Sequence, residues 1–318
     1  KDRRVEARDS MKRALPRYAR INTLAHGVTW GHVRRELDRT GHVWWRPSAK
    51  EKQTVAGTTL NPEVPKGAGS NVYFRDMHVE DLLVFCPMGQ SQTSDIEMFG
   101  SGTLIFQQKA SLLPALALAP PPGAHVVDAC AAPGSKTSQL AALMKNDGTV
   151  FALDRDKRRL DTLDRLMKQR RATCVQPRLA DFLEVSPSDP KLARVTHMLL
   201  DPSCSSSGMT TEPLADEGTV AELAANQRRI IRHAMRFPSV QRIAYSTCSV
   251  YQEENEQVVA SVLASEEGAA FRLASCLPWW PRRGHASCFP GAELCVRTEL
   301  EDQTIGFFVA LFERAAAT

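Results

Sequence analysis

Two cysteines lie in short loops rich in serine and threonine, and each loop directly follows a predicted strand. Cys204 belongs to Asp201-Pro-Ser-Cys-Ser-Ser-Ser-Gly208, and Cys248 belongs to Tyr245-Ser-Thr-Cys-Ser249. A free cysteine is most often a packed core residue, whereas a thiolate in a polar loop is a candidate nucleophile. Because ligands of α/β proteins bind at the carboxyl edge of the sheet, both thiols are expected there. Position alone does not rank the two thiols.

A third loop, from Asp128 to Thr137, has the residues of a ligand-binding turn. It reads Asp-Ala-Cys-Ala-Ala-Pro-Gly-Ser-Lys-Thr, and Gly134 can adopt torsion angles that are closed to other residues. The start of the following helix suits an anion, and Asp154, which ends the next predicted strand, suits a ribose. The loop is neither a dinucleotide fingerprint nor a P-loop. S-adenosylmethionine meets both demands, while a tight glycine turn in an unrelated α/β enzyme explains the loop alone equally well.

A thiolate, a carboxylate and a methyl donor together suggest methylation of a pyrimidine at carbon 5. That carbon is a poor nucleophile until a thiolate adds to carbon 6. Asp201 would then act as an acid near ring nitrogen 3, if it is protonated or shares a proton. Lys136 across the site would help to lower the pKa of the thiol. After methyl transfer, a base removes the carbon 5 proton and the thiol leaves.

These loops need a frame, and the hydrophobic pattern predicts alternating strands and helices after Gly123. The predicted strands that end in Asp128, Asp154 and Asp201 indicate one polar edge. Such alternation favours an α/β fold with a doubly wound, mostly parallel sheet and helices on both faces. The predicted strands are His125–Asp128, Thr149–Asp154, Cys174–Leu179, Val195–Asp201, Arg242–Ser246 and Gly306–Phe312, and the predicted helices are Lys136–Lys145, a charged helix through Arg170, Val220–Phe237 and Glu254–Ser265.

The part before Gly123 is patterned differently. We expect a helix near the start that is broken at Pro16, and an exposed loop between Ser48 and Gly69. Threonine and glycine at its ends predict a helix over Thr29–Arg39. The predicted strands here are Tyr18–Thr23, Asp81–Phe85 and Gly102–Phe106.

Composition excludes several classes of protein. The chain has 318 residues, of which 43% are hydrophobic and 24% charged, so it is not a disordered protein. Its eight cysteines form no CxxC pair, which indicates a reducing compartment. The spacing of Cys276, Cys288 and Cys295 is no recurrent zinc pattern, so no metal is expected. The longest apolar run, Leu112 to Leu118, is too short to span a bilayer, so no membrane contact is expected.

Basic residues concentrate near the start of the chain. Residues 1–50 hold thirteen basic and five acidic side chains, a net charge of +8 against +4 for the whole chain. This asymmetry fits a polyanion and a solvated basic face equally well. Trp44 and Trp45 could stack on bases, although core packing is favoured for them. Trp279-Trp280-Pro-Arg-Arg283 is a second candidate RNA-binding edge, and core packing is favoured there too. Candidate phosphate contacts are Arg17, Arg20, Arg34, Arg35 and Arg39.

The three loops, taken in order, resemble the signature of the Nop2/Sun-type RNA (cytosine-5) methyltransferases. The resemblance covers about residues 16–318, and the stretches Val185–Pro190, Arg236–Arg242 and Phe289–Glu293 look most like the eukaryotic member-five branch. It implies a seven-stranded Rossmann-like sheet over residues 109–318, preceded by a small α+β RNA-recognition-like region over residues 1–108. It also implies 5-methylcytosine formation in large-subunit (25S/28S) ribosomal RNA through a covalent thiol adduct.

The resemblance also assigns roles to residues. It implies that Cys248 is the nucleophile and that Cys204 assists release of the methylated base. Ser206 departs from the family, because a glycine is usual there, and Gln107 to Ser111 lacks the usual Gln-Asp, which leaves a substrate contact open. Implied contacts of S-adenosylmethionine are Cys130, Ala131, Ala132, Pro133, Gly134, Ser135, Lys136, Asp154, Arg159, Asp181 and Asp201.

The expected partners are ribosomal RNA or pre-ribosomal particles, and the expected location is the nucleus and nucleolus. The protein is expected to act as a monomer, on a cytosine that is flipped out of its stack. Two alternatives stay open at this point. A methyltransferase for proteins or small molecules would need the cofactor loop but not two thiols, and a catalytically silent RNA-binding scaffold would bind RNA without methyl transfer.

Overall fold

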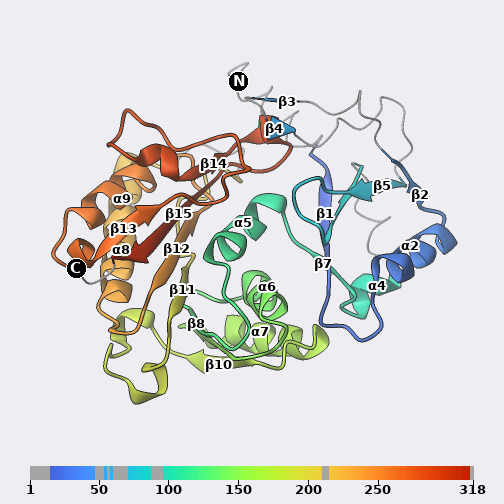
Figure 1. Cartoon of the computed structure of the whole chain (residues 1–318), viewed down its shortest axis with the longest axis horizontal. Helices are drawn as coiled ribbons and strands as arrows, with labels where there is room; N and C mark the ends of the chain where they lie inside the picture. Colours follow the sequence, from blue (N-terminus) through green and yellow to red (C-terminus); the bar gives the residue numbers. More distant parts are fainter. Residues whose placement is uncertain are drawn as a thin grey trace.

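A mixed sheet forms the frame of the larger unit (Figure 1). The computed structural model describes residues 15–46, 54–55, 58–59, 71–86, 96–209 and 215–315. Within these residues, seven strands follow the order β10-β9-β8-β11-β12-β15-β13, and β14 pairs with β15 beside them. Neighbours from β10 to β12 run parallel, and β15 is antiparallel to its partners. The strands are β8 (His125–Asp128), β9 (Thr149–Asp154), β10 (Val175–Leu179), β11 (His197–Leu200), β12 (Arg242–Thr247), β13 (Phe271–Ala274), β14 (Val296–Thr298) and β15 (Phe307–Arg314).

Helices cover both faces of this sheet, as the alternating pattern predicts (Figure 1). On one face lie α5 (Lys109–Leu118), α6 (Ser135–Leu143) and α7 (Lys157–Gln169), and on the other lie α8 (Glu217–Met235) and α9 (Glu256–Leu263). Successive strand residues alternate between the two cores, so Val126 packs with α6 and Val127 with the opposite layer. Short 3-10 turns are η2 (Phe182–Glu184), η3 (Pro190–Leu192), η4 (Glu267–Ala270), η5 (Ala292–Leu294) and η6 (Leu300–Asp302).

A second, smaller sheet is built from the first part of the chain, in the order β2-β5-β6-β1-β7. The side chain of Thr29 caps α2 by accepting a hydrogen bond from the amide of His32 at 3.2 Å, and Val33 and Leu37 pack into the core of this unit. Its elements are β1 (Arg17–Ile21), α2 (Trp30–Arg39), β2 (Val43–Trp44), β5 (Val72–Arg75), β6 (Leu82–Phe85), α4 (Glu97–Gly100) and β7 (Leu104–Phe106), and β3 (Thr54–Val55) pairs separately with β4 (Thr58–Thr59).

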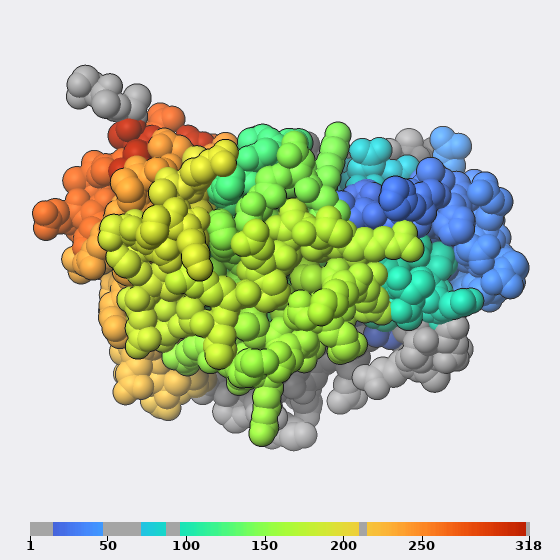
Figure 2. All heavy atoms as spheres, turned by 90° about the horizontal axis from the view of Figure 1, so that it is seen from below, coloured from blue at the N-terminus to red at the C-terminus, as the bar shows by residue number. Residues whose placement is uncertain are grey.

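Buried polar contacts hold the two units together. Asn22 donates its side-chain amide to the carbonyl of Arg170 at 2.8 Å, and Lys109 forms an ion pair with Asp76 at 2.6 Å. Arg20 donates to the hydroxyl of Ser138 in α6 at 2.9 Å. Figure 2 shows the smaller unit, blue to teal, directly against one end of the larger unit. The last strand of the smaller sheet, β7, ends at Phe106, and the first helix of the larger unit, α5, begins at Lys109.

The structure confirms the α/β sheet and corrects the prediction in places. Strands His125–Asp128 and Thr149–Asp154 occur with the predicted bounds. The sequence pattern missed β5, β13 and β14, which are short, and α5, which is apolar on every side and contains Pro114. The described residues of the expected loop 48–69 are β3 and β4, which pair antiparallel, and the predicted first helix lies mostly outside the described residues. No described helix is both long and apolar enough to cross a membrane.

Candidate active site

The predicted loops meet at the carboxyl edge of the parallel strands and enclose a cavity of about 310 Å³. It is lined by residues that directly follow β8, β9, β10, β11 and β12. Of the three carboxylates that end predicted strands, only two line this cavity. Asp154 and Asp201 line the cavity, whereas Asp128 is buried behind it, accepts a hydrogen bond from Thr137 at 2.8 Å and has a pKa that burial raises to about 7.

The loop after β8 follows the surface of α7 closely. Gly134 has φ +104°, and a Cβ there would lie 2.7 Å from Cε of Met167, so the position requires glycine on two grounds. No side chain caps α6 at Gly134. The first amides of α6 are therefore available to an anionic group.

Asp154 fixes this loop from the next strand. One carboxylate oxygen accepts the amide of Ala132 at 3.2 Å, and the other accepts the amide of Asp156 at 2.9 Å. Arg159 lies 3.7 Å from the same carboxylate and donates to the carbonyl of Ala132 at 2.5 Å. Each carboxylate oxygen can accept a further bond, which leaves capacity for ribose hydroxyls.

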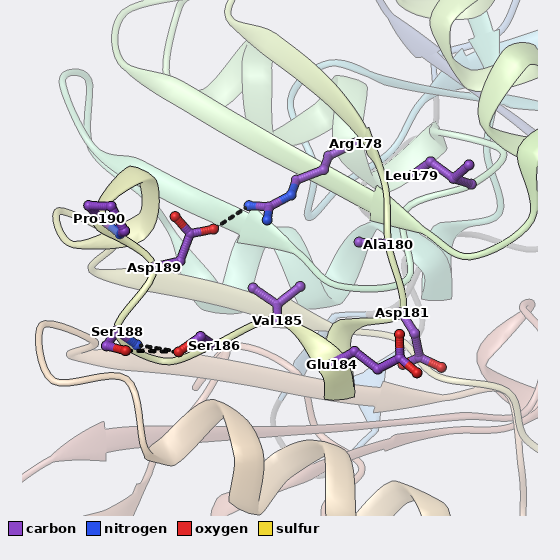
Figure 3. Close-up of a pocket in the computed structure, with 10 residues that line it drawn as sticks. All are labelled: Arg178, Leu179, Ala180, Asp181, Glu184, Val185, Ser186, Ser188, Asp189 and Pro190. Atoms are coloured by element: carbon purple, nitrogen blue, oxygen red, sulfur yellow. Dashed lines mark hydrogen bonds and ion pairs between the residues drawn. The ribbon is translucent and has the colours of Figure 1, made fainter.

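Ala180 and Asp181 line both this cavity and a neighbouring hollow of about 560 Å³. The side chain of Asp181 accepts the amide of Leu183 and so caps η2. In Figure 3, Asp181 lies at one end of the hollow, and at the other end Arg178 and Asp189 point toward one another, 2.8 Å apart. The predicted contact at Asp181 therefore lies between the first cavity and this hollow.

The two thiols are direct neighbours, with 3.2 Å between the Sγ atoms of Cys204 and Cys248. This hydrogen bond lowers the pKa of Cys248 to about 7, and it raises that of Cys204, which is also buried. The hydroxyl of Ser206 lies 3.5 Å from Cys248 and lowers the same pKa further. The directions of the two shifts favour Cys248 as the thiolate, a ranking that sequence position did not give.

Asp201 is engaged by two donors. Lys136 lies 2.7 Å from one carboxylate oxygen, and the hydroxyl of Ser246 donates to the other at 2.5 Å. Lys136 lowers the pKa of Cys248, but its contribution is the smallest, and that of the hydrogen bond with Cys204 is the largest. The direction of the effect expected for Lys136 therefore holds, although the contribution is small and the direct partner of Lys136 is Asp201.

A second cavity, of about 290 Å³, opens on the other side of the thiols. It lies between the junction of the units and β15, and both cavities are lined by Asp201, Pro202, Cys204 and Cys248. The thiols thus line two cavities at once. Two phenylalanines and a methionine also line the second cavity: Phe106, Met209 and Phe307. The sequence did not predict them, because no local pattern distinguishes them from core residues.

The predicted cofactor residues divide between these cavities. Ser135 and Lys136 line the second cavity, and Ala131, Pro133 and Gly134 line neither but shape the loop. The remaining predicted residues, Cys130, Ala132, Asp154, Arg159, Asp181 and Asp201, line the first cavity.

A buried polar network behind the thiols was not predicted. The fully buried carboxylate of Glu254 accepts the amide of Ser205 at 3.0 Å, its hydroxyl at 2.5 Å, and the side-chain amide of Gln227 at 2.9 Å. These bonds tie the Cys204 loop to α8 and to the turn before α9. Serine-rich loops signal such networks only weakly in a sequence.

The residues predicted to contact RNA differ in their exposure. Arg34, Arg35 and Arg39 are exposed on α2, whereas Arg20 is 4% exposed at the junction, so its expected phosphate contact is wrong. Trp280 is 1% exposed and donates to the carbonyl of Arg297, which excludes it as an RNA edge.

The other tryptophans of these predictions pack within the fold. The ring centroids of Trp44 and Trp30 are 4.7 Å apart, Trp45 packs on Phe74, and Trp279 stacks on His78. Among the described residues, no cluster of three or more His, Cys, Asp or Glu side chains could hold a metal.

Comparison with known proteins agrees with this geometry. The family model described as 16S rRNA methyltransferase RsmB/F matches residues 115–285. The chain is 43% identical over 309 residues to a mouse 28S rRNA (cytosine-C(5))-methyltransferase, covering 95% of this chain and 63% of the relative. It is 38% identical to the Caenorhabditis elegans 26S rRNA (cytosine-C(5))-methyltransferase nsun-5, covering 98% of this chain and 71% of the relative.

Solved structures show the same fold. A methyltransferase homologue from Pyrococcus horikoshii is 25% identical with a TM-score of 0.74, covering 96% of this chain and 89% of that one. The chain spans 63% of the mouse relative and 44% of an Arabidopsis thaliana relative named 25S rRNA (cytosine-C(5))-methyltransferase NSUN5. Motifs, fold and the matches over most of the chain agree, and the chain therefore belongs to the RsmB/F, or Nop2/Sun, family of rRNA methyltransferases.

Proposed function

We propose that this chain is an S-adenosylmethionine-dependent RNA methyltransferase that forms 5-methylcytosine in large-subunit (25S/28S) ribosomal RNA. The observation that carries the proposal is the thiol pair that lines both cavities. A protein or small-molecule methyltransferase would not need this pair, and the relatives are named as rRNA (cytosine-C(5))-methyltransferases.

The residues of the first cavity fit S-adenosylmethionine, which supplies an electrophilic methyl group when bound. The buried carboxylate of Asp154, which lines this cavity, suits its ribose, whereas the uncapped start of α6, which suits an anionic group, lines the second cavity through Ser135 and Lys136. The glycine at position 134 lets the loop after β8 lie close to Met167 and Leu163 of α7. Cys130, Ala132, Arg159, Asp181 and Asp201 complete the lining of this cavity.

Cys248 is the proposed nucleophile. Its thiolate adds to carbon 6 of cytosine, and a proton bound at nitrogen 3 neutralises the charge that develops in the ring. The ion pair of Lys136 and Asp201 is the proposed source of this proton, because the ammonium can donate to the carboxylate at 2.7 Å. Carbon 5 then has the electron density needed to take up a methyl group.

Cys204 is the proposed base for product release. In the resting protein the hydrogen bond with Cys248 and desolvation hold the pKa of Cys204 high, and the charge on Cys248 adds to both. Once Cys248 is bonded to carbon 6, its charge no longer acts on Cys204, so the Cys204 thiol can lose its own proton to solvent. The resulting thiolate, with its sulfur 3.2 Å from that of Cys248, then accepts the proton from carbon 5. Loss of this proton and departure of the Cys248 sulfur restore the aromatic ring.

The smaller unit, with the exposed arginines of α2, is proposed to bind the RNA backbone, so that residues 1–108 recognise RNA and residues 109–318 carry the chemistry. Its guanidinium groups would give a sequence-independent affinity that falls with salt. Pre-ribosomal particles as the partner, nucleolar residence and a monomeric state belong to the same proposal.

Methyl transfer from radiolabelled cofactor to large-subunit rRNA transcripts tests the proposal. We expect transfer by the intact chain, none by Cys248→Ala, and a denaturation-resistant protein–RNA adduct with Cys204→Ala. Cys288→Ala is the matched control, because this half-buried cysteine lies outside both cavities. RNA binding without transfer by the intact chain would favour a silent scaffold, and full activity of Cys248→Ala would refute the nucleophile.

A further inference from the structure

Ser206 adopts a backbone conformation that favours glycine. Its φ is +57°, in the left-handed region, where a side chain crowds the backbone. The related motif commonly has glycine at this position, so this chain keeps a sterically unfavourable serine where an unstrained residue is available. A strained residue at a candidate active site motivates the search for a function.

The side chain of Ser206 supplies a contact that glycine cannot. Its Oγ lies 3.5 Å from Sγ of Cys248, and its backbone amide bonds to Cys204. The residue lines the first cavity together with both thiols. The left-handed turn therefore places one serine against both sulfur atoms.

We propose that Ser206 is a further catalytic residue. Its hydroxyl oxygen accepts a hydrogen bond from the Cys248 thiol at 3.5 Å, and when that thiol ionises the hydroxyl turns its own proton toward the sulfur and holds the thiolate ready for attack. This inference rests on the proposed function only for the identity of the reaction. A hydroxyl donor stabilises the ionised sulfur, and Ser206 lowers the pKa of Cys248 accordingly.

Other groups around Cys248 set the background for this effect. Cys204, from the same loop as Ser206, makes the largest contribution to the lowered pKa. Asp201, at the end of β11, raises it, and Lys136, from α6, lowers it. Substitution of Ser206 leaves these three groups in place, so the change in ionisation reports the hydroxyl.

Two substitutions separate the hydroxyl from the backbone conformation. Ser206→Ala removes the hydroxyl and keeps the strained φ, whereas Ser206→Gly removes both. The measurement is the rate of alkylation of Cys248 by iodoacetamide between pH 5 and 10, followed by mass spectrometry of the peptide. Ser186→Ala is the control, because this exposed serine lines the separate hollow of Figure 3.

We expect both variants to raise the apparent pKa of Cys248 by about half a unit to one unit, a roughly three- to tenfold loss of alkylation rate at low pH. Ser206→Gly should also raise the melting temperature, since it relieves the left-handed strain. Profiles equal to that of the unsubstituted chain in both variants would overturn the proposal, as would a shift in Ser206→Ala alone. A shift in both variants without methyl transfer by the intact chain would instead refute the proposed function and leave the hydroxyl contact standing.

Discussion

Replacement of Asp154 tests the cofactor site most directly. The carboxylate is 4% exposed, and its oxygens accept the amides of Ala132 and Asp156. If the same carboxylate also accepts two ribose hydroxyls, Asp154→Ala removes two hydrogen bonds to a charged acceptor. Each contributes about 1.5–3 kcal/mol, so the lower end, about 3 kcal/mol in total, corresponds to a roughly 100-fold weaker Kd for the cofactor.

The same substitution has a cost in stability. The buried amide of Ala132 loses its acceptor, which costs about 1–3 kcal/mol of the free energy of unfolding. Asp154→Asn keeps an acceptor oxygen and the side-chain volume, and it separates loss of charge from loss of packing. The matched control is Asp164→Ala, which removes a half-exposed carboxylate paired with Lys168 on α7.

Isothermal titration with S-adenosylmethionine and a gel-shift assay with rRNA transcripts measure the two affinities separately. We expect the cofactor affinity of Asp154→Ala and Asp154→Asn to fall while RNA affinity changes less than threefold, and we expect neither to change in Asp164→Ala. Equal losses of both affinities would contradict the ribose role, because a general disturbance of the fold would then explain the result. Unchanged cofactor affinity in Asp154→Asn would show that the charge is not needed.

Three further predictions follow from other contacts. The transfer rate should rise with pH and reach half of its maximum near pH 7, because the thiolate of Cys248 forms as pH passes its pKa of about 7; a rate independent of pH between 6 and 8 would contradict this. Lys109→Met should lower the free energy of unfolding in urea by about 3–5 kcal/mol, because it leaves the buried carboxylate of Asp76 without its 2.6 Å partner; a loss below 1 kcal/mol would refute the argument. Gly208→Ala should lower the melting temperature and abolish transfer, since its Cβ would lie 2.0 Å from a backbone carbonyl oxygen, whereas Gly100→Ala, with nothing within 4 Å, should change neither; a Gly208→Ala protein as active as the unsubstituted chain would mean that the loop adapts.

Local signals were enough to place the central elements of the fold. Strand β9 occurs with its predicted bounds because an apolar run that ends in Asp154 is a signal contained in the segment itself. Helix α2 begins after Thr29, whose side chain caps it. This signal too is local, because the cap and the amide that it accepts lie within one helical turn. The loops that carry the thiols and the cofactor residues were found for the same reason.

Short strands and unusual helices were missed because their stability comes from partners distant in sequence. Strands β13 and β14 have four and three residues and exist through pairing with β15. Helix α5 contains Pro114, which disfavours a helix locally, but eight of its ten residues are buried. Burial outweighs the local preference there.

The sequence by itself determined the fold class, the edge at which the site lies and the residue types that meet there, since periodicity and motif order are local properties. Only the tertiary structure decided the rest: that Asp128 lies behind the cavity, that Arg20 is buried at the junction, and that the contact between the two thiols lowers the pKa of Cys248 and raises that of Cys204. These outcomes depend on desolvation and on hydrogen bonds between segments far apart along the chain, as in the 3.2 Å contact between two sulfur atoms 44 residues apart. No local pattern encodes such distances.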